Sequence, residues 1–470
     1  MRNRKITVTL AVSVSLFAVL FLVTGCATGP KLDKPLINIG LGETVITPEE
    51  NLKMRGFARS QVATGTHDEL HARTLIVEDG NGKSIALMTL AIIGISVDTA
   101  EQIRSGITSQ TGIPAENIAI SCTHTHAGPS MRGSEKYQVL LVERSIESAV
   151  QAWNNREPGR IGIASTQVLE LGRARRRLLY GGVHPDPEVC VIKVEDALGN
   201  LRGIAFNYGC HPSALDWHNT LYSEDWPYYA IQGIKDEVGN DVWVAYYQSA
   251  QGDINVGYLA ELSAVGVDMP VRTMWYIGVK GGQMASAVIS KLPGIVTDGS
   301  VEVDAARDHF EYPCRDSYPV TLKQAERDAE AAKKILAKLE SDSALQDTRI
   351  VDRARVDVFS TGQRFRSAQR FYSDNFPESR TLEQQSVRIG DAVFITYPGE
   401  LFSEIALKIK EQSPLEKTYV IGVTAGPGGY LPAAKEFIEG DYEVDGSVYS
   451  PKTEQVCIDS SLEMIRRVVK

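Results

Sequence analysis

Two histidines two positions apart, His124 and His126, are the residues whose types and spacing most clearly allow chemistry. They follow the apolar run 117–122, which is typical of a β-strand, and they precede the turn-forming pair Gly128-Pro129. Side chains two apart on a strand share a face, so both imidazoles can bind one metal ion. Alternatively, one histidine can be a metal ligand while the other acts as an acid or base. On this motif alone, a surface or structural role for the pair stays open.

Three further segments supply side chains of the types that zinc accepts. They are His211 in residues 206–213, Glu400 in residues 397–400 and Tyr430 in residues 428–431, and each follows an apolar run and lies at a turn. Catalytic zinc typically binds three protein nitrogen or oxygen ligands and keeps one position open. Two histidines, a glutamate and an optional tyrosine meet that requirement, so the sequence predicts a zinc site.

At this point the chain resembles a known family. The segments that carry the resemblance, in chain order, are Thr47-Pro48, residues 65–73, Thr123-His124-Thr125-His126-Ala127-Gly128-Pro129, His211-Pro212-Ser213, Gly252-Asp253, Pro398-Gly399-Glu400 and the block 430–442. Together they are similar to the neutral/alkaline non-lysosomal ceramidases, which are zinc-dependent amidases. The resemblance covers roughly residues 37–470, and several ordered motifs are more specific than any single one.

The resemblance implies a role for individual residues of this chain. The implied zinc ligands are His124, His211, Glu400 and Tyr430; His126 faces the substrate, and Tyr442 matches a second active-site tyrosine. The family's active-site arginine falls within residues 172–178, where several arginines cluster, and Arg176 is the favoured position. At least two of the four arginines of the cluster are expected to belong to a solvated basic turn.

Two positions depart from the family pattern. Asn255 stands where ceramidases carry a serine, and Ala91 stands where many relatives have an aspartate. An asparagine cannot act as a nucleophile, although its amide can donate a hydrogen bond to a developing oxyanion. Loss of an outer carboxylate can loosen a ligand histidine. The substrate can therefore differ from ceramide even if the chemistry is kept.

The implied mechanism is hydrolysis by metal-activated water. His126 or a nearby carboxylate would handle the proton, and Tyr442, Asn255 or Arg176 would stabilise the oxyanion. Asp253 is the spare carboxylate closest to these motifs in the sequence. An Asx-type turn after Gly252 is the alternative role for Asp253.

The N-terminus predicts the cellular compartment. Arg2, Arg4 and Lys5 precede the apolar run 6–23, and small residues then lead to Cys26, as in a bacterial lipoprotein signal. We therefore expect a signal peptide over residues 1–25, a lipidated tether over 26–36 that begins at Cys26, and one hydrolase domain over 37–470. This arrangement places the chain in the bacterial cell envelope, lipid-anchored to a membrane and either periplasmic or surface-exposed. A plain transmembrane anchor is the alternative, but the run is short for a span.

Charge and composition limit the classes of partner. The formal net charge is −10, and becomes −13 without the three basic residues of the signal, which disfavours nucleic acid as a partner. Apart from Cys26 there are five cysteines, an odd number that cannot all pair within one chain. We expect Cys122, Cys190 and Cys210 to be small buried hydrophobic residues.

Periodicity predicts a mixed α/β fold, and the resemblance adds mixed β-sheets flanked by helices with the metal site at strand ends. Expected strands are 84–93, 118–122, 189–194, 203–208, 242–247, 392–396 and 419–423; expected helices are 100–112, 139–155, 321–339, 401–412 and 453–469. Residues 341–386 are polar and arginine-rich, and a substrate-facing loop is our hypothesis for them.

Three functions agree with the sequence. The first is a zinc-dependent amidase of an N-acyl lipid such as ceramide, and the second is a zinc hydrolase of a non-sphingolipid amide or ester, which Asn255 favours. The third is a surface lipoprotein that binds but does not turn over, favoured by Ala91 and Asn255 and opposed by the full ligand set. Membrane contact in each case is expected through the lipid on Cys26.

Overall fold

The computed structural model describes residues 36–176, 182–267, 273–346, 348–426 and 428–469. The predicted signal peptide and nearly all of the predicted tether, including Cys26, lie outside the described residues. Within these residues, no helix is both long and apolar enough to cross a membrane.

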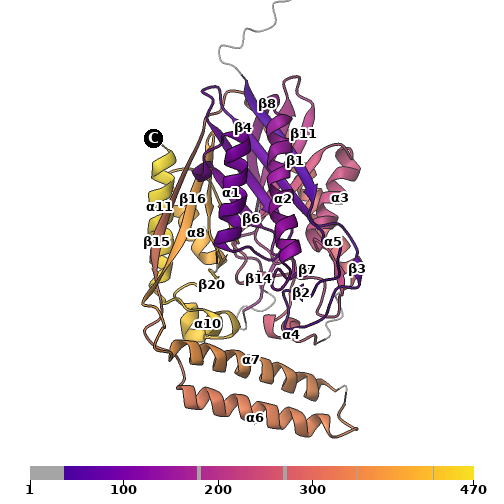
Figure 1. Cartoon of the computed structure of the whole chain (residues 1–470), viewed down its shortest axis with the longest axis vertical. Coiled ribbons are helices and arrows are strands. Elements are labelled where there is room, and N and C mark those ends of the chain that lie inside the picture. Colours follow the sequence, from indigo (N-terminus) through magenta and orange to yellow (C-terminus); the bar gives the residue numbers. More distant parts are fainter. Residues whose placement is uncertain (1–35, 177–181, 268–272, 347, 427, 470) are drawn as a thin grey trace, which may run out of the picture. The chain divides into compact units, whose positions relative to one another are not determined.

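Two sheets form the centre of the fold (Figure 1). The larger one has eight strands within the described residues, in the spatial order β13 (Trp243–Gln248), β11 (Leu201–Tyr208), β10 (Glu188–Asp196), β8 (Glu157–Gln167), β1 (Ile37–Val45), β4 (His71–Glu78), β5 (Ser84–Leu90) and β6 (Ile118–Cys122). The smaller one has four, in the order β15 (Val303–Pro313), β16 (Ser379–Ile389), β17 (Ala392–Thr396) and β19 (Lys417–Ile421). The pairs β5–β6, β11–β13 and β17–β19 are parallel, and the other pairs in these sheets are antiparallel.

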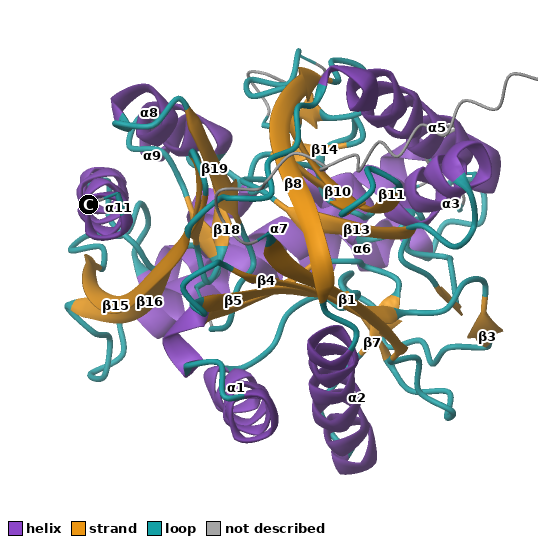
Figure 2. Cartoon of the chain, turned by 90° about the horizontal axis from the view of Figure 1, so that it is seen from above, coloured by secondary structure: helices purple, strands orange, loops and turns teal. Residues whose placement is uncertain are grey.

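Three clusters of buried hydrophobic side chains hold the sheets and helices together. One cluster joins the larger sheet to α1 (Val97–Thr111), α2 (Glu135–Asn154), α3 (Trp226–Val238) and α5 (Met274–Lys291). A second contains side chains from both sheets, among them Leu75, Val387 and Phe394, so the two sheets pack against each other. A third joins the smaller sheet to α8 (Ser403–Gln412) and α11 (Thr453–Val468). Figure 2 shows these helices on the outside and the strands between them. The predicted fold class, a mixed α/β protein with sheets flanked by helices, is confirmed.

The two edge strands of the larger sheet approach each other because the sheet curls. The Tyr247 hydroxyl at the end of β13 donates to the carbonyl of Leu87 on β5 at 2.9 Å, and the Gln248 amide donates to the carbonyl of Thr123 just after β6 at 3.0 Å. As a result, the chain that leaves β6 and the chains that leave β11 and β13 meet at one end of the sheet.

Short elements complete the fold. Two-stranded pairs are β2 (Met54–Arg55) with β7 (Gly128–Pro129), β3 (Gly65–Thr66) with β12 (Leu221–Tyr222), β9 (Arg173–Ala174) with β14 (Ile254–Asn255), and β18 (Glu400–Leu401) with β20 (Tyr430–Leu431). Short helices are α4 (Ala260–Ala264), α9 (Glu436–Glu439) and α10 (Tyr442–Gly446).

One predicted region is wrong. Residues 341–386, for which we expected a substrate-facing loop, contain α7 (Arg349–Phe371) and the first part of β16. With α6 (Leu322–Glu340), α7 forms a helical hairpin that lies beside α10 in Figure 1. The predicted strands 118–122 and 392–396 match β6 and β17 residue for residue, whereas the other predicted elements differ at their ends by up to four residues.

Candidate metal centre

The strand that carries the two-histidine motif ends before either histidine. β6 stops at Cys122, and His124 has a left-handed backbone with a φ of 70°, which is uncommon outside glycine. The His124 Nδ1 atom lies 2.7 Å from the carbonyl oxygen of Ile93, so Nδ1 carries the proton and Nε2 faces the site. His126 and His124 do converge, with ring centroids 5.2 Å apart, but through this turn and not through the strand alternation that we expected.

His211 follows β11 and is completely buried. Its Nδ1 atom lies 2.9 Å from the carbonyl oxygens of both Gln251 and Ile254, which fixes the ring and again leaves Nε2 facing the site. Burial and the charge of Arg175 lower the pKa of the His211 imidazole to about 3. The ring is therefore neutral near pH 7, which is the form that binds a metal ion.

Glu400 reaches the same point from the smaller sheet. It follows β17, and β18 places it opposite Tyr430 of β20. The Glu400 Oε2 atom lies 3.0 Å from His211 Nε2 and 3.6 Å from His124 Nε2. Burial raises the pKa of the Glu400 carboxyl, but the neighbouring His124 and His211 imidazoles lower it more, to about 2. Glu400 is therefore an anion in a buried site.

These three atoms fit a metal ion. In a neutral imidazole whose Nδ1 proton is held by a carbonyl, Nε2 is an acceptor, and the carboxylate oxygen is also an acceptor. Within the described residues, Glu400 Oε2 has no hydrogen-bond donor. Ligand atoms of a tetrahedral zinc, each about 2.0 to 2.1 Å from the metal, lie about 3.3 Å from one another, and the separations of 3.0 and 3.6 Å are close to this spacing.

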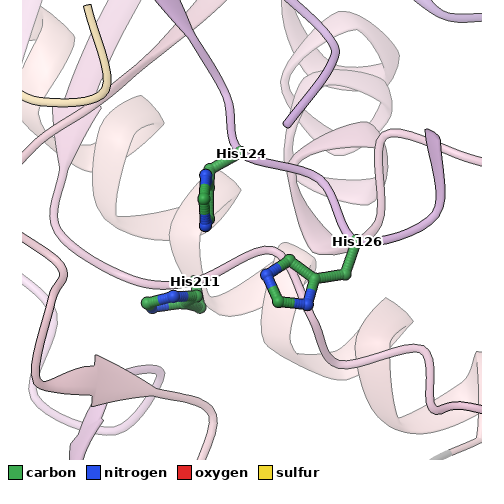
Figure 3. A group of neighbouring side chains, drawn as sticks. All are labelled: His124, His126 and His211. Carbon is green, nitrogen blue, oxygen red and sulfur yellow. The ribbon is translucent and has the colours of Figure 1, made fainter. Parts of the chain in front are cut away.

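His126 completes a wider cluster with the other two histidines (Figure 3). One ring nitrogen from each of His124, His126 and His211 lies within 4.8 Å of the others, a spacing that permits a shared ion. Both ring nitrogens of His126 are buried and have no partner within the described residues. Burial, then the neighbouring His124 and His211, lowers the pKa of His126 well below its usual value. His126 is thus a neutral imidazole available to a metal ion or a substrate.

The arginine that contacts the site is Arg175. The sequence favours Arg176, and this assignment is wrong. The Arg175 guanidinium donates to His211 Nε2 at 3.2 Å, to the Tyr430 hydroxyl at 3.0 Å and to the Gly252 carbonyl at 2.8 Å. Arg176 instead bonds to Glu436 and Glu443 and to the carbonyl of Gly440. Arg173 pairs with Asn255 in the β9–β14 ladder, and Arg177 lies outside the described residues.

Tyr430 and Tyr442 both line the pocket beside His126 and Arg175. Their ring centroids are 5.9 Å apart. The Tyr430 hydroxyl accepts from Arg175, which lies between it and His211. Its assignment as a metal ligand therefore stays a prediction, as does the active-site role of Tyr442.

Asp253 and Asn255 have local hydrogen-bonding partners. The Asp253 carboxylate accepts from the backbone N–H of Ser403 at 2.8 Å and from its hydroxyl at 2.7 Å, at the start of α8. The Asn255 side chain bonds to the backbone of Gly257 and Tyr258. The expected contributions of Asp253 to proton transfer and of Asn255 to oxyanion stabilisation find no support in these contacts. Both side chains instead hold backbone segments near the site.

Other side chains at the site were not predicted from the sequence. The Arg59 guanidinium donates to the His126 carbonyl at 2.7 Å, and the Phe57 ring packs edge-on against the His126 ring. Ser213 and Tyr258 line the pocket with Phe57. Ser213 lies within the motif His211-Pro212-Ser213 noted in the sequence, but no sequence signal distinguishes Phe57, Arg59 or Tyr258.

The five cysteines of the described part are reduced and buried, which was expected for Cys122, Cys190 and Cys210. Burial raises the pKa of the thiols of Cys122 and Cys210, which adjoin the motif histidines. Neither thiol is therefore prepared to act as a thiolate ligand or nucleophile.

The fold and this cluster define a mixed α/β protein with a candidate metal centre where strands of two sheets end. The family model for the neutral/alkaline non-lysosomal ceramidase N-terminal domain matches residues 37–257. Over these residues, the chain is similar to the neutral/alkaline non-lysosomal ceramidases.

Individual relatives agree with this similarity. Neutral ceramidase of Oryza sativa is 29% identical over 217 residues, which are 40% of this chain and 27% of that protein. Neutral ceramidase 1 of Arabidopsis thaliana is 30% identical over 237 residues, 44% of this chain and 30% of that protein. The neutral ceramidase of Pseudomonas aeruginosa is 26% identical over 212 residues, 40% of this chain and 32% of that protein. The matches thus span about a third or less of the length of these relatives.

The fold is shared over a longer stretch. The crystal structure of neutral ceramidase from Pseudomonas aeruginosa superposes with a TM-score of 0.70 at 19% identity, and covers 93% of this chain and 75% of that one. A structure described as ceramidase complexed with C2 also has a TM-score of 0.70, at 17% identity, over 92% of this chain and 76% of that one. The family-model match ends before Glu400 and Tyr430, whereas the structural similarity extends over 93% of this chain.

Proposed function

We propose that this protein is a zinc-dependent hydrolase that cleaves the amide bond of an N-acyl lipid of the ceramide type. The observation that carries the proposal is the convergence of His124 Nε2, His211 Nε2 and Glu400 Oε2 in a buried site. The similarity of residues 37–257 to the ceramidase family supports the reaction class. The similar proteins from Oryza sativa, Arabidopsis thaliana and Pseudomonas aeruginosa are neutral ceramidases, which supports the substrate class.

The protein's own groups divide the remaining work. A zinc ion held by His124, His211 and Glu400 would supply a Lewis acid for the scissile carbonyl. His126, whose two ring nitrogens have no partner within the described residues, can accept a proton from the attacking water and return it to the leaving amine. Arg175 lines the pocket and carries the positive charge nearest to it, so it can stabilise an oxyanion.

Metal analysis combined with turnover tests the proposal. Purified protein lacking the signal segment should contain about one zinc per chain and hydrolyse a short-chain N-acyl sphingosine. His124→Ala and His211→Ala should lose both properties. His309→Ala removes an exposed histidine of β15 and should change neither. Wild-type protein that folds but binds no zinc when zinc is offered would exclude this mechanism.

A non-sphingolipid amide or ester is the second candidate substrate. Asn255 favours it, because the residue at the family's serine position has its side chain bonded to its own turn. Parallel assays with ceramides, other N-acyl lipids and matched esters distinguish the two. Zinc binding without turnover on the whole panel would instead favour the binding-protein hypothesis.

We also propose that a lipid on Cys26 holds the protein at a bacterial membrane, on the basis of the sequence alone. The lipid would bring the pocket close to a membrane-embedded substrate. Mass spectrometry of the N-terminal peptide from membranes tests this, with Cys26→Ser as the control. An unmodified Cys26 in protein purified from its native membrane would contradict the proposal.

A further inference from the structure

The side chain of Asn255 builds a turn that brings a tyrosine into the pocket. Its Oδ1 atom accepts from the backbone N–H of Gly257 at 2.8 Å and of Tyr258 at 3.1 Å, and its Nδ2 donates to the carbonyl of Tyr258 at 2.8 Å. The Tyr276 hydroxyl holds the same turn by donating to the Val256 carbonyl at 2.8 Å. The backbone that leads to Tyr258 is therefore fixed on both sides.

Tyr258 in turn controls the hydroxyl of Ser213. The Tyr258 hydroxyl donates to the carbonyl of Ser213, and the same hydroxyl lies 2.6 Å from Ser213 Oγ. A phenol has one proton, and a carbonyl can only accept, so the proton of Tyr258 lies on the carbonyl bond. Ser213 Oγ must then donate its own proton to Tyr258. Both residues are buried, with exposed fractions of 2% for Ser213 and 1% for Tyr258.

This arrangement gives the pocket an acceptor. Ser213 Oγ has two lone pairs, and its only proton is directed to Tyr258. Ser213 and Tyr258 line the same pocket as His126 and Arg175. Arg175 is a donor, and the acceptor nitrogen of His126 is assigned to proton transfer, so Ser213 is an acceptor that remains for a donor on the substrate.

We propose that Ser213, oriented by Tyr258, determines specificity by accepting a hydrogen bond from the N–H of the substrate amide. An ester has an oxygen at that position, and its lone pairs would face those of Ser213. A buried acceptor that meets no donor disfavours the ester, because polar groups left unpaired in a site are costly. The inference rests on the proposed function, because it concerns which bond the same pocket selects.

The test compares one amide with its ester. An N-acyl amino alcohol with a short acyl chain and its O-acyl isostere are assayed with zinc-loaded wild type, Ser213→Ala, Ser213→Thr and Tyr258→Phe. The expected result is that Ser213→Ala lowers the amide-to-ester ratio of kcat/KM about 10-fold, the size of one hydrogen bond to a desolvated group. Tyr258→Phe should also lower the ratio, and Ser213→Thr should restore it.

The matched control is Ser165→Ala. Ser165 Oγ lies 2.8 Å from the Tyr419 hydroxyl, so it belongs to a serine–tyrosine pair of the same kind on β8 and β19, away from the pocket residues. This variant should leave the ratio unchanged. Zinc content and thermal melting of every variant show whether the site and the fold are kept.

Equal losses of kcat/KM on the amide and the ester in Ser213→Ala would overturn the inference, because that result is expected of a serine with only a structural role. The proposed function would not be affected by it. If wild type hydrolyses neither compound, the proposed function fails, and titration calorimetry with the same pair decides the inference. Tighter binding of the amide that disappears in Ser213→Ala would support it. Equal affinities, or no binding of either compound, would overturn it.

Discussion

His211 Nε2 and Glu400 Oε2 lie 3.0 Å apart, although both atoms are acceptors when the imidazole is neutral. Two buried acceptors repel each other unless a cation or a shared proton lies between them. The structure holds them together through backbone contacts on both sides, since His211 Nδ1 bonds to the Gln251 carbonyl and the Glu400 N–H donates to the Gly429 carbonyl. The Arg175 guanidinium, which donates to His211 Nε2 at 3.2 Å, supplies one positive charge beside this pair, and a metal ion bound by the two atoms would replace that contact.

Glu400→Gln should separate metal binding from folding. The amide keeps the shape of the side chain but removes the negative charge, and its N–H can donate to His211 Nε2. We expect zinc affinity to fall by more than ~10-fold, the loss that even an outer partner of a ligand causes. The melting temperature of the metal-free variant should not fall below that of metal-free wild type. Competition with a coloured chelator and calorimetric melting measure both, and unchanged zinc affinity would remove Glu400 from the site.

Arg175→Lys and Arg176→Lys should differ in their effect on turnover. Lysine keeps the charge but cannot bond to His211, Tyr430 and Gly252 together, as the Arg175 fork does. We expect kcat/KM to fall at least ~10-fold in Arg175→Lys, equivalent to about 1.4 kcal/mol of transition-state stabilisation. Arg176→Lys should lower the melting temperature and change kcat/KM less than ~3-fold. The opposite order would restore Arg176 as the active-site arginine.

The sequence predicts the elements that carry the ligands better than the orientation of single side chains. β6 and β17 are short buried runs of apolar residues, so their ends are clear from the pattern. The convergence of His124 and His126 was also predicted, but from strand alternation. The structure shows a left-handed turn at His124 instead, because the chain crosses from β6 toward the Pro212 carbonyl, which accepts from the His126 N–H.

Long-range packing explains what the sequence did not indicate. α7 is amphipathic, but it is the most polar of the long helices and its buried side chains are few, among them Val351, Ala354 and Ala368, so its composition was typical of a loop. Arg175 and Arg176 both follow the two-residue strand β9 (Arg173–Ala174), so which of them reaches the site depends on the path of the chain after β9. That path is set by pairing with β14 and by the bond from the Arg175 N–H to the Asp253 carbonyl, about eighty residues later in the sequence.

Asp253→Asn tests whether this carboxylate takes part in proton transfer. In the structure it anchors the first turn of α8, two residues after β18, which carries Glu400. The Asn oxygen can still accept from the Ser403 N–H, so we expect kcat to fall less than ~10-fold with an unchanged pH profile. Removal of a general base costs about 10²- to 10⁴-fold. A loss of that size with normal zinc content would make Asp253 the base.

The ionisation of Glu224 should make the free energy of unfolding depend on pH in the acidic range. Burial raises the pKa of this carboxyl, but the charge of Arg73, whose Nη1 lies 2.8 Å from both carboxylate oxygens, and the neighbouring His71 lower it to about 2. Because the folded pKa lies below the ordinary value of 4.5, the stabilisation is present above about pH 4.5 and is lost as the pH falls toward about 2. The shift corresponds to about 3 kcal/mol of unfolding free energy.

Urea unfolding of Glu224→Gln measures that contribution. At pH 7 the variant should be less stable than wild type by about 3 kcal/mol, since Arg73 loses a buried partner, and the difference should shrink steadily below about pH 4. Asp304→Asn is the control, because its pairing with Lys83 is at the surface and is worth less than about 1 kcal/mol. A stability difference for Glu224→Gln that stays constant from pH 7 to pH 3 would show that the carboxylate charge is not its source, and packing around Arg73 would then explain the loss.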